Sequence, residues 1–436
     1  MSENFDSLEW KVFKSLSGKL GSVHTDAEIY AYIEAAVKSI DPTADKDKVD
    51  AIFAHSQKFD PVDGYIRDPE IEDIMINNTE NIFVYHASDG SKKAPERLNS
   101  VEQLDTLVSK LNMYSTSNVA NGHIYDVHLP NGSRCNVVDT PMGPAITIRN
   151  HKPIAYSIID LINFGELSYN LAARFWLYSE GLGIEPANML LGGLPGSGKT
   201  TLLNAMFSFY RPEERIIVIE ETYEINTKTQ ENCINLETSP DMSLQDLLSN
   251  ALRMRPDIII IGEVRGVEAK DMMAAMSIGK SVMSTLHAYS TRDIIKRMEH
   301  DPMRIPQDMI SLVDALVVVS QVQKAGKKHR TVTQVSEISG METQVLLSDL
   351  YNYDYKTQKS SEMLPSVTYR DTLAKASGHS PTEIIMEEER RAKILERLNK
   401  TGIRDLRSIN EFCRDYYDNP AKALARINSA DLGTLD

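Results

Sequence analysis

Eight consecutive residues, Gly193-Leu-Pro-Gly-Ser-Gly-Lys-Thr200, have the types and the spacing to bind a phosphate chain. They fit the pattern G-x-x-x-x-G-K-[ST], in which glycines let backbone N–H groups curl around phosphates. The lysine reaches the β- and γ-phosphates, and the threonine ligates Mg²⁺. The sequence therefore predicts a site for ATP and Mg²⁺ that is built by Gly193, Leu194, Pro195, Gly196, Ser197, Gly198, Lys199, Thr200 and Thr201, with Thr200 on the metal.

The segments on either side of this loop must position it. Residues 188–192 predict a buried strand that enters the loop. Residues 200–207 predict the helix that leaves it, with the positive end of the helix dipole toward the bound anion. A glycine-rich turn that merely precedes a lysine is the alternative, and the strand–loop–helix order argues against it.

Hydrolysis also needs a carboxylate that orients water, and Glu263 is the first candidate. It follows the apolar strand Ile258–Ile261, which would deliver it to the edge of a sheet where ligands sit. Gly262 occupies the place of the usual Walker B aspartate, so Glu263 is predicted to act on the water or on the hydration shell of the metal. An exposed loop acid is the alternative reading.

Three further acids, Glu220, Glu221 and Glu224, end another predicted strand, Ile216–Glu220. Clustered carboxylates repel one another unless a cation or a water network shares them. Mg²⁺ at the phosphate loop would do so, and we therefore predict Glu220 and Glu221 as metal ligands. A solvated acidic turn is the alternative for any one of these residues.

Polar residues elsewhere could complete the site. His287 directly follows the predicted strand Ser281–Leu286, where it could bond to a γ-phosphate oxygen or to a catalytic glutamate. Arg134 and Arg149 lie on predicted neighbouring strands that precede the phosphate loop. A planar guanidinium suits phosphate oxygens and the charge that develops in the transition state, whereas a lone arginine usually only solvates a surface.

Composition bounds the class of protein. The net charge is −15, which disfavours non-specific attraction to nucleic acid or to an anionic bilayer. No apolar run approaches the length of a membrane span, and the first residues lack the pattern of a secretory signal. The three cysteines, Cys135, Cys233 and Cys413, form no C-x-x-C pair, which is typical of free thiols in a reducing compartment. A cytoplasmic protein is expected.

The chain is long enough for two or three domains. We predict a helical lead-in over residues 1–55, an α+β domain over 56–150 and a linker helix region over 151–187. Strands and helices alternate over 188–364 as in an α/β nucleotide-binding domain. A helical region follows over 365–436, where Ser380-Pro-Thr-Glu383 predicts a capped helix start.

Together these motifs resemble those of the type II/IV secretion ATPase superfamily. Its members share a Walker A loop, an acidic box, a Walker B strand that ends in Gly-Glu, and a histidine box. The corresponding segments here are residues 193–200, 220–224, 258–263 and 279–287. Residues 253–257 and 262–266 are most similar to the archaeal branch, which drives the archaellum and archaeal type IV pili, and the C-terminal segments 387–391, 402–405 and 415–420 are similar too.

The sequence also departs from the family pattern. Glu221 replaces the usual aspartate of the acidic box, and Lys280 replaces the first histidine of the histidine box. The four-cysteine zinc insert of the bacterial type II secretion ATPases is missing, and the N-terminal extension is short for an archaellum motor.

The resemblance implies a RecA-like P-loop ATPase core, a smaller preceding α+β domain and a helical C-terminal tail. It further implies Glu224 and Glu263 as catalytic glutamates, with Arg134 and Arg149 reaching the nucleotide from the N-terminal domain. The implied assembly is a homo-oligomeric ring of six, docked on a polytopic membrane platform protein at the inner face of the cell membrane. Tight-adherence pilus ATPases and DNA-transfer ATPases are similar relatives, and a nucleotide-gated adaptor with little hydrolysis is a further alternative.

Overall fold

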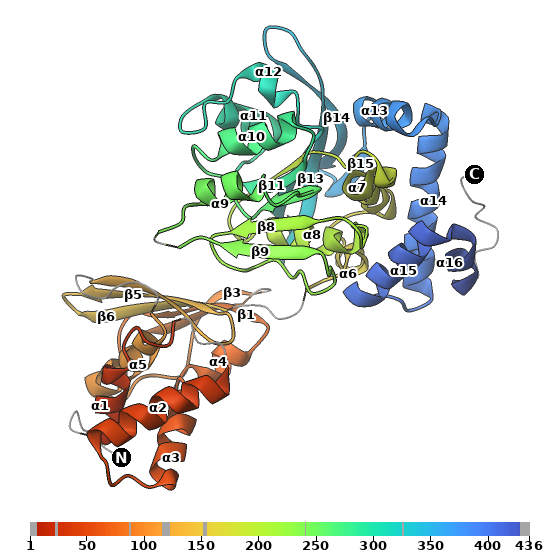
Figure 1. Cartoon of the computed structure of the whole chain (residues 1–436). Coiled ribbons are helices and arrows are strands. Elements are labelled where there is room, and N and C mark those ends of the chain that lie inside the picture. Colours follow the sequence, from red (N-terminus) through yellow and green to blue (C-terminus); the bar gives the residue numbers. More distant parts are fainter. Residues whose placement is uncertain are drawn as a thin grey trace. The chain divides into compact units, whose positions relative to one another are not determined.

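Two units make up the chain, residues 1–153 and residues 154–436 (Figure 1). The structure is a computed structural model that describes residues 7–21, 25–86, 89–115, 123–150, 155–239, 241–324 and 327–427. Residues 151–154, where the linker region was predicted to begin, and residues 428–436, at the end of the predicted helical tail, lie outside these ranges. Each unit is described by itself.

The first unit contains one antiparallel sheet of order β3-β2-β1-β6-β5-β4. Its strands are β1 (Ile71–Ile76), β2 (Ile82–His86), β3 (Gly90–Lys93), β4 (Ile124–His128), β5 (Arg134–Thr140) and β6 (Gly143–Arg149). Its helices are α1 (Leu8–Ser15), α2 (Asp26–Ile40), α3 (Lys46–Ser56), α4 (Asp63–Arg67) and α5 (Val101–Met113).

One hydrophobic core holds this unit together. Alternate residues of the strands, such as Ile74, Ile146 and Ile148, are fully buried, because successive side chains of a strand point to opposite faces. The same core takes in Val12 of α1 and Ile33 of α2, so the N-terminal helices pack with the sheet. Ser100 caps α5 by accepting a hydrogen bond from the backbone N–H of Gln103.

The second unit contains a nine-stranded sheet of order β15-β14-β13-β12-β7-β11-β10-β8-β9. The six strands from β12 to β9 in this order run parallel to their neighbours. They are β7 (Met189–Gly192), β8 (Ile216–Glu220), β9 (Cys233–Glu237), β10 (Ile258–Ile261), β11 (Ser281–Leu286) and β12 (Ala315–Lys324).

Helices cover both faces of this sheet, and the strand side chains alternate between two cores. Ile258 and Ile260 of β10 lie in one core, whereas Ile259 and Ile261 lie in the other. Burial on both faces explains why this strand is an unbroken apolar run. The prediction of an α/β core is therefore confirmed.

The helices of the second unit follow one another along the chain between these strands and after them. They are α6 (Ile158–Asn163), α7 (Tyr169–Glu180), α8 (Lys199–Met206), α9 (Leu244–Ala251), α10 (Ala269–Ser277), α11 (Thr291–Glu299), α12 (Gln307–Ile310), α13 (Thr368–Ser377), α14 (Pro381–Lys400), α15 (Leu406–Asp418) and α16 (Pro420–Arg426). The predicted start of α14 is confirmed, because Ser380 and Glu383 form a capping box with Pro381 in the first turn.

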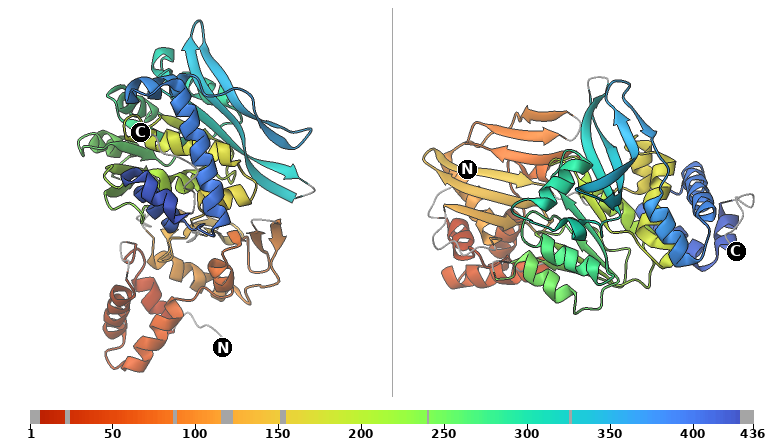
Figure 2. Two further views of the ribbon diagram at one scale, coloured as in Figure 1. Left: turned by 90° about the vertical axis from the view of Figure 1, so that its right-hand side faces the viewer. Right: turned by 90° about the horizontal axis from the view of Figure 1, so that it is seen from above.

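An antiparallel extension of the sheet was not predicted from the sequence. Strands β13 (Lys327–Met341), β14 (Val345–Asp354) and β15 (Lys359–Glu362) continue the sheet beyond β12 (Figure 2). The apolar pattern expected of a buried strand is interrupted in β13 by Glu337, which is fully buried. It accepts hydrogen bonds from the Tyr178 hydroxyl at 2.9 Å and from the backbone N–H of Thr368 at 3.0 Å, so burial leaves the carboxylate paired.

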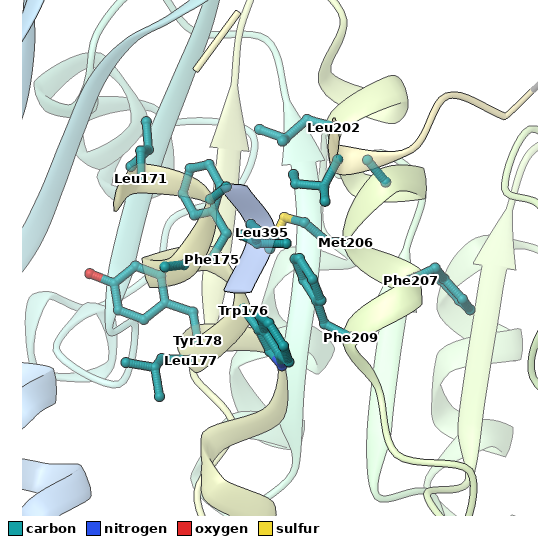
Figure 3. Close-up of a cluster of buried hydrophobic side chains, with 14 of the residues drawn as sticks. Leu171, Phe175, Trp176, Leu177, Tyr178, Leu202, Met206, Phe207, Phe209 and Leu395 are labelled. Atoms are coloured by element: carbon teal, nitrogen blue, oxygen red, sulfur yellow. The ribbon is translucent and has the colours of Figure 1, made fainter. Parts of the chain in front are cut away.

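The C-terminal helices belong to the same core as the sheet. Figure 3 shows the buried side chains of α7, α8 and α14 together, with Trp176, Met206 and Leu395 among them. The Trp176 ring stacks on Phe209 with 5.2 Å between ring centroids. Burial of large aromatic rings is a main stabilising term in such a core.

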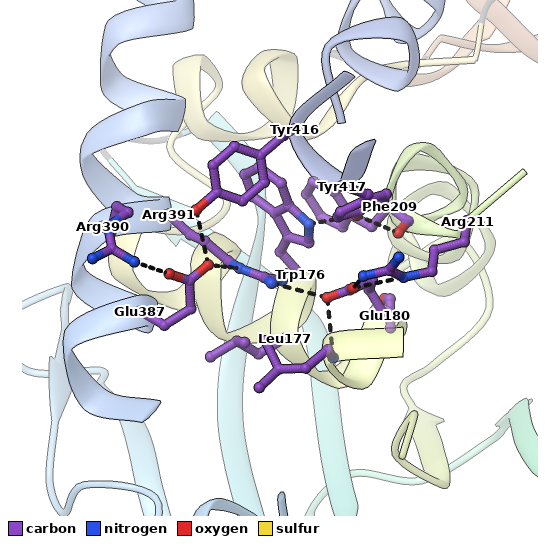
Figure 4. A network of polar contacts seen from close by, with 12 residues as sticks. Trp176, Leu177, Glu180, Phe209, Arg211, Glu387, Arg390, Arg391, Tyr416 and Tyr417 are labelled. Carbon is purple, nitrogen blue, oxygen red and sulfur yellow. Dashed lines mark hydrogen bonds and ion pairs between the residues drawn. The ribbon is translucent and has the colours of Figure 1, made fainter. Parts of the chain in front are cut away.

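A buried ionic network crosses this core between α7 and α14 (Figure 4). Arg391 donates from Nη2 to Glu180 at 2.9 Å and from Nε to Glu387 at 2.8 Å. Its guanidinium lies 4.9 Å from the centroid of the Trp176 ring, and Tyr416 donates to Glu387 at 3.0 Å. The network therefore ties the C-terminal helices to the rest of the unit.

Replacing Arg391 with methionine is expected to lower the free energy of unfolding of this unit by about 3–5 kcal/mol, because two buried carboxylates lose a partner. Urea unfolding followed by Trp176 fluorescence in a Trp10→Phe background would measure it. The matched control is Arg407→Met, whose side chain is exposed and, within the described part of the chain, paired only with Glu411. Its midpoint should equal the wild-type value. Equal midpoints for the two variants would contradict a stabilising role for the network.

No helix within the described residues is both long and apolar enough to cross a bilayer. Those residues likewise contain no group of three His, Cys, Asp or Glu side chains that could hold a metal ion by itself.

Candidate active site

Four of the predicted motifs meet at one edge of the nine-stranded sheet. The parallel strands β7, β11, β10 and β8 are neighbours in this order. Their C-terminal ends lead to the phosphate loop, to His287, to Glu263 and to Glu220, respectively. The carboxyl edge of a parallel sheet is the usual ligand side, and the register brings the four segments together there.

The phosphate loop has the backbone of an anion cradle. Gly196 and Gly198 have φ angles of +73° and +103°, which favour glycine. A Cβ atom at Gly193 would collide with Ser197 Oγ and with the carbonyl oxygen of Val319. Gly198 is the N-cap of α8, and no side chain caps this helix. The first backbone N–H groups of α8 are therefore available to a bound anion.

Two side chains of the loop fit a bound phosphate. Lys199 is largely buried, and its ammonium donates to the carbonyl oxygens of Gly193 at 2.9 Å and Leu194 at 3.3 Å. Ser197 is buried, and its Oγ has no hydrogen-bond partner among the described residues. A buried hydroxyl without a partner is costly, and a phosphate oxygen would supply one. The residues present therefore fit a nucleotide, and Thr200 fits a ligand of its Mg²⁺.

Glu263 and His287 are in contact, which is one of the two contacts that the sequence left open for this histidine. His287 Nε2 lies 3.1 Å from Glu263 Oε1, and Nδ1 lies 3.4 Å from Lys199 Nζ. Nδ1 also lies 3.2 Å from the carbonyl oxygen of Gly193, so both ring nitrogens have polar partners. The histidine thus joins the phosphate-binding ammonium to the carboxylate.

Electrostatics keep Glu263 ionised. Burial raises its pKa, but Arg265, His287 and Lys199 outweigh burial and hold the pKa below its usual value. Arg265 donates from Nε at 2.7 Å and from Nη2 at 3.1 Å, which is a bidentate pair. An ionised carboxylate is the form that can accept a proton from water.

Glu220 is buried and holds the turn that follows β8. Its carboxylate accepts from the backbone N–H of Glu224 at 3.1 Å and of Ile225 at 3.2 Å. A Cβ atom at Gly262 would lie 3.1 Å from Glu220 Cγ, tighter than ordinary contact. A side chain at 262, including the usual Walker B aspartate, would therefore require the buried Glu220 side chain to shift.

The other two acids of this cluster are exposed. Arg265 Nη1 lies 3.4 Å from Glu221 Oε2, so the arginine bridges Glu221 and Glu263. The backbone carbonyl of Glu224 accepts from Asn204 at 3.1 Å, which ties this turn to α8. Metal ligation by Glu220 and Glu221 and catalysis by Glu224 stay predictions. Proteins commonly hold Mg²⁺ with one or two carboxylates together with phosphates and water.

Arg134 and Arg149 lie side by side in the first unit. They are direct partners in the antiparallel pairing of β5 and β6, and their side chains therefore share one face. Their neighbours in the strand, Cys135 and Ile148, are buried on the opposite face. The prediction that the two arginines occupy neighbouring strands is confirmed, and their role stays a prediction.

Sequence reasoning missed several residues that shape the site. Thr285 donates from Oγ1 to the carbonyl oxygen of Gly262 at 2.7 Å and fixes the peptide before Glu263. Glu268 accepts from the backbone N–H groups of Arg265 and Gly266 at 2.6 and 2.7 Å. Arg265 lies in residues 262–266, a segment that resembles the family, so the sequence could have drawn attention to it. No local sequence pattern predicts the contacts of Thr285.

The chain belongs to the family of type II/IV secretion system proteins, whose model matches residues 56–409. This confirms the family that the four motifs predict. Among similar proteins is the uncharacterized protein MJ0900 of Methanocaldococcus jannaschii, which is 31% identical over 375 residues, covering 82% of this chain and 67% of that protein. The conjugal transfer protein TrbB of Rhizobium radiobacter is 30% identical over 209 residues, covering 45% of this chain and 61% of that protein.

A solved structure with a similar arrangement is the ATPase DotB of Legionella pneumophila. The likeness covers 80% of this chain and 93% of that one, with 16% identity and a TM-score of 0.48.

Proposed function

We propose that this protein is the ATP-hydrolysing motor of a type II/IV secretion-like machine that powers assembly of a type IV pilus-like or archaellum filament. The observation that carries the proposal is the contact chain from Lys199 through His287 to Glu263 beside a glycine cradle. It joins a phosphate-binding cation to an ionised carboxylate, and phosphate-chain hydrolysis uses both groups.

In the proposed mechanism the chain's own residues divide the work. The backbone of the loop and Lys199 hold the β- and γ-phosphates, and Thr200 holds the metal. Glu263 orients the attacking water and accepts its proton, while His287 keeps that carboxylate in place. When bound, Mg²⁺ neutralises charge on the phosphate oxygens.

The rest of the proposal concerns assembly. Arg134 and Arg149 complete the site from the first unit, where their shared face would present two guanidinium groups to phosphate oxygens. The protein forms a ring of six and docks from the cytoplasm on a polytopic membrane platform protein. Closure of the N-terminal unit after ATP binding would convert hydrolysis into movement.

A DNA-transfer ATPase is the second candidate, and the similarity to a conjugal transfer protein favours it. The net charge of −15 weighs against non-specific DNA binding.

Steady-state phosphate release from the purified protein tests both candidates. We expect Mg²⁺-dependent ATP turnover that duplex or single-stranded DNA leaves unchanged, together with co-purification of a multi-span membrane protein. Turnover that rises severalfold with DNA would favour DNA transfer instead. Tight ATP binding without any phosphate release, also in the presence of the membrane partner, would point to a nucleotide-gated adaptor.

A further inference from the structure

Two side chains outside the predicted site contact the backbone of the phosphate loop at Gly196. The carbonyl oxygen of Gly196 accepts a hydrogen bond from Gln321 Nε2 at 2.9 Å and another from Arg330 Nε at 3.0 Å. Gln321 lies on β12 and Arg330 lies on β13, and they are directly opposite in the antiparallel pairing. One cross-strand pair therefore grips a single backbone atom of the loop.

The stem of Arg330 also covers the loop. A Cβ atom built at Gly198 would lie 3.3 Å from Arg330 Cδ, so the aliphatic stem packs against the third glycine of the loop. The next two residues of β13 are anchored in turn, because Thr331 Oγ1 and the Val332 N–H donate to the carbonyl oxygen of Glu166 at 3.0 and 2.9 Å. The position of Arg330 is thus set by the sheet.

A loop rich in glycine needs such support. Gly196 has a φ of +73°, and a glycine loses more backbone freedom on ordering than any other residue. If the loop were unsupported, nucleotide binding would have to order it. Two hydrogen bonds to the carbonyl oxygen of Gly196 fix the orientation of its peptide plane before any nucleotide arrives.

We propose that Gln321 and Arg330 are positioning residues that hold the phosphate loop in its nucleotide-binding shape through the carbonyl oxygen of Gly196. This inference rests on the proposed nucleotide binding. Both residues act through the loop backbone, and the group of Arg330 that contacts the loop carbonyl oxygen is its Nε–H.

Three substitutions at one position separate the hydrogen bond from the charge. Counted along the side chain, glutamine places its Nε2 where arginine has Nε, so Arg330→Gln keeps a donor and loses the charge. Arg330→Met places a methyl group there and loses both. Arg330→Lys places a methylene group there and keeps a charge one atom further along.

The experiment is binding of fluorescent ADP and ATP with Mg²⁺ to the full-length variants at fixed ionic strength. We expect Arg330→Met, Arg330→Lys and Gln321→Met to bind about tenfold more weakly, and Arg330→Gln to keep most of the affinity. In turnover assays the loss should appear in KM, with kcat retained at saturating ATP. Lys328→Met is the matched control, because Lys328 is exposed on the same face of β13 two residues earlier.

The outcomes separate this inference from the function on which it rests. If Arg330→Lys kept its affinity and Arg330→Gln lost it, attraction of phosphate by the arginine charge would replace positioning. If all variants at 321 and 330 bound like wild type while Lys199→Ala did not, the inference would fail and the nucleotide site would stand. If Lys199→Ala also bound like wild type, the proposed function itself would fall.

Discussion

Replacing Lys199 with alanine is expected to reduce ATP turnover to below about 1% of the wild-type rate. The ammonium is buried, lies within hydrogen-bonding distance of two loop carbonyls, and is 3.4 Å from His287. Alanine removes the only charge that this loop offers to the β- and γ-phosphates, so both binding and transition-state stabilisation should suffer. Phosphate release and fluorescent-nucleotide binding measure the two effects separately.

The control for this variant is Lys270→Ala, which removes an exposed lysine from α10. Its turnover should match the wild-type rate. Undiminished hydrolysis in Lys199→Ala would sink the assignment of residues 193–200 as the phosphate site.

Replacing Glu263 with glutamine should slow turnover by about a hundredfold to a thousandfold while ATP binding is retained. Glutamine has nearly the same shape, and its single carbonyl oxygen can still accept hydrogen bonds from Arg265 Nε and His287, although its NH2 group cannot accept from Arg265 Nη2. It cannot accept a proton, so the effect falls on kcat and leaves KM nearly unchanged. Single-turnover hydrolysis, compared with nucleotide affinity, separates the chemical step from binding.

A matched control is Glu342→Gln, which removes an exposed carboxylate from the turn between β13 and β14. Equal rates for Glu263→Gln and for this control would remove Glu263 from the mechanism. A parallel loss of ATP binding would instead assign Glu263 to the architecture of the loop, through His287 and Lys199.

Local sequence patterns predicted the strands β7, β8 and β10 because these strands are short and fully buried. Strand β10 consists of four isoleucines, and a strand covered on both faces needs no alternation. The start of α14 could also be predicted, because Ser380, Pro381 and Glu383 are close together in the sequence. Patterns of this kind depend only on residues within one element.

The strands β13 to β15 could not be predicted in the same way. Glu337 interrupts the apolar pattern of β13, and its burial is possible only because Tyr178 and the first turn of α13 donate hydrogen bonds to it. These partners lie 159 and 31 residues away in sequence. Whether a buried charge is tolerated depends on tertiary partners, which no local window contains.

The sequence by itself predicted the candidate site of this protein: the phosphate loop, the carboxylate after β10 and the histidine after β11. Each lies at the end of a strand, and the spacing of types within one motif suffices to recognise it. Only the tertiary structure decided the contacts between motifs, namely that His287 meets Glu263, that Arg265 neutralises the acids, and that β13 brings Arg330 to the loop. The physical reason is that strand order and register, which local sequence does not encode, set which side chains share an edge of the sheet.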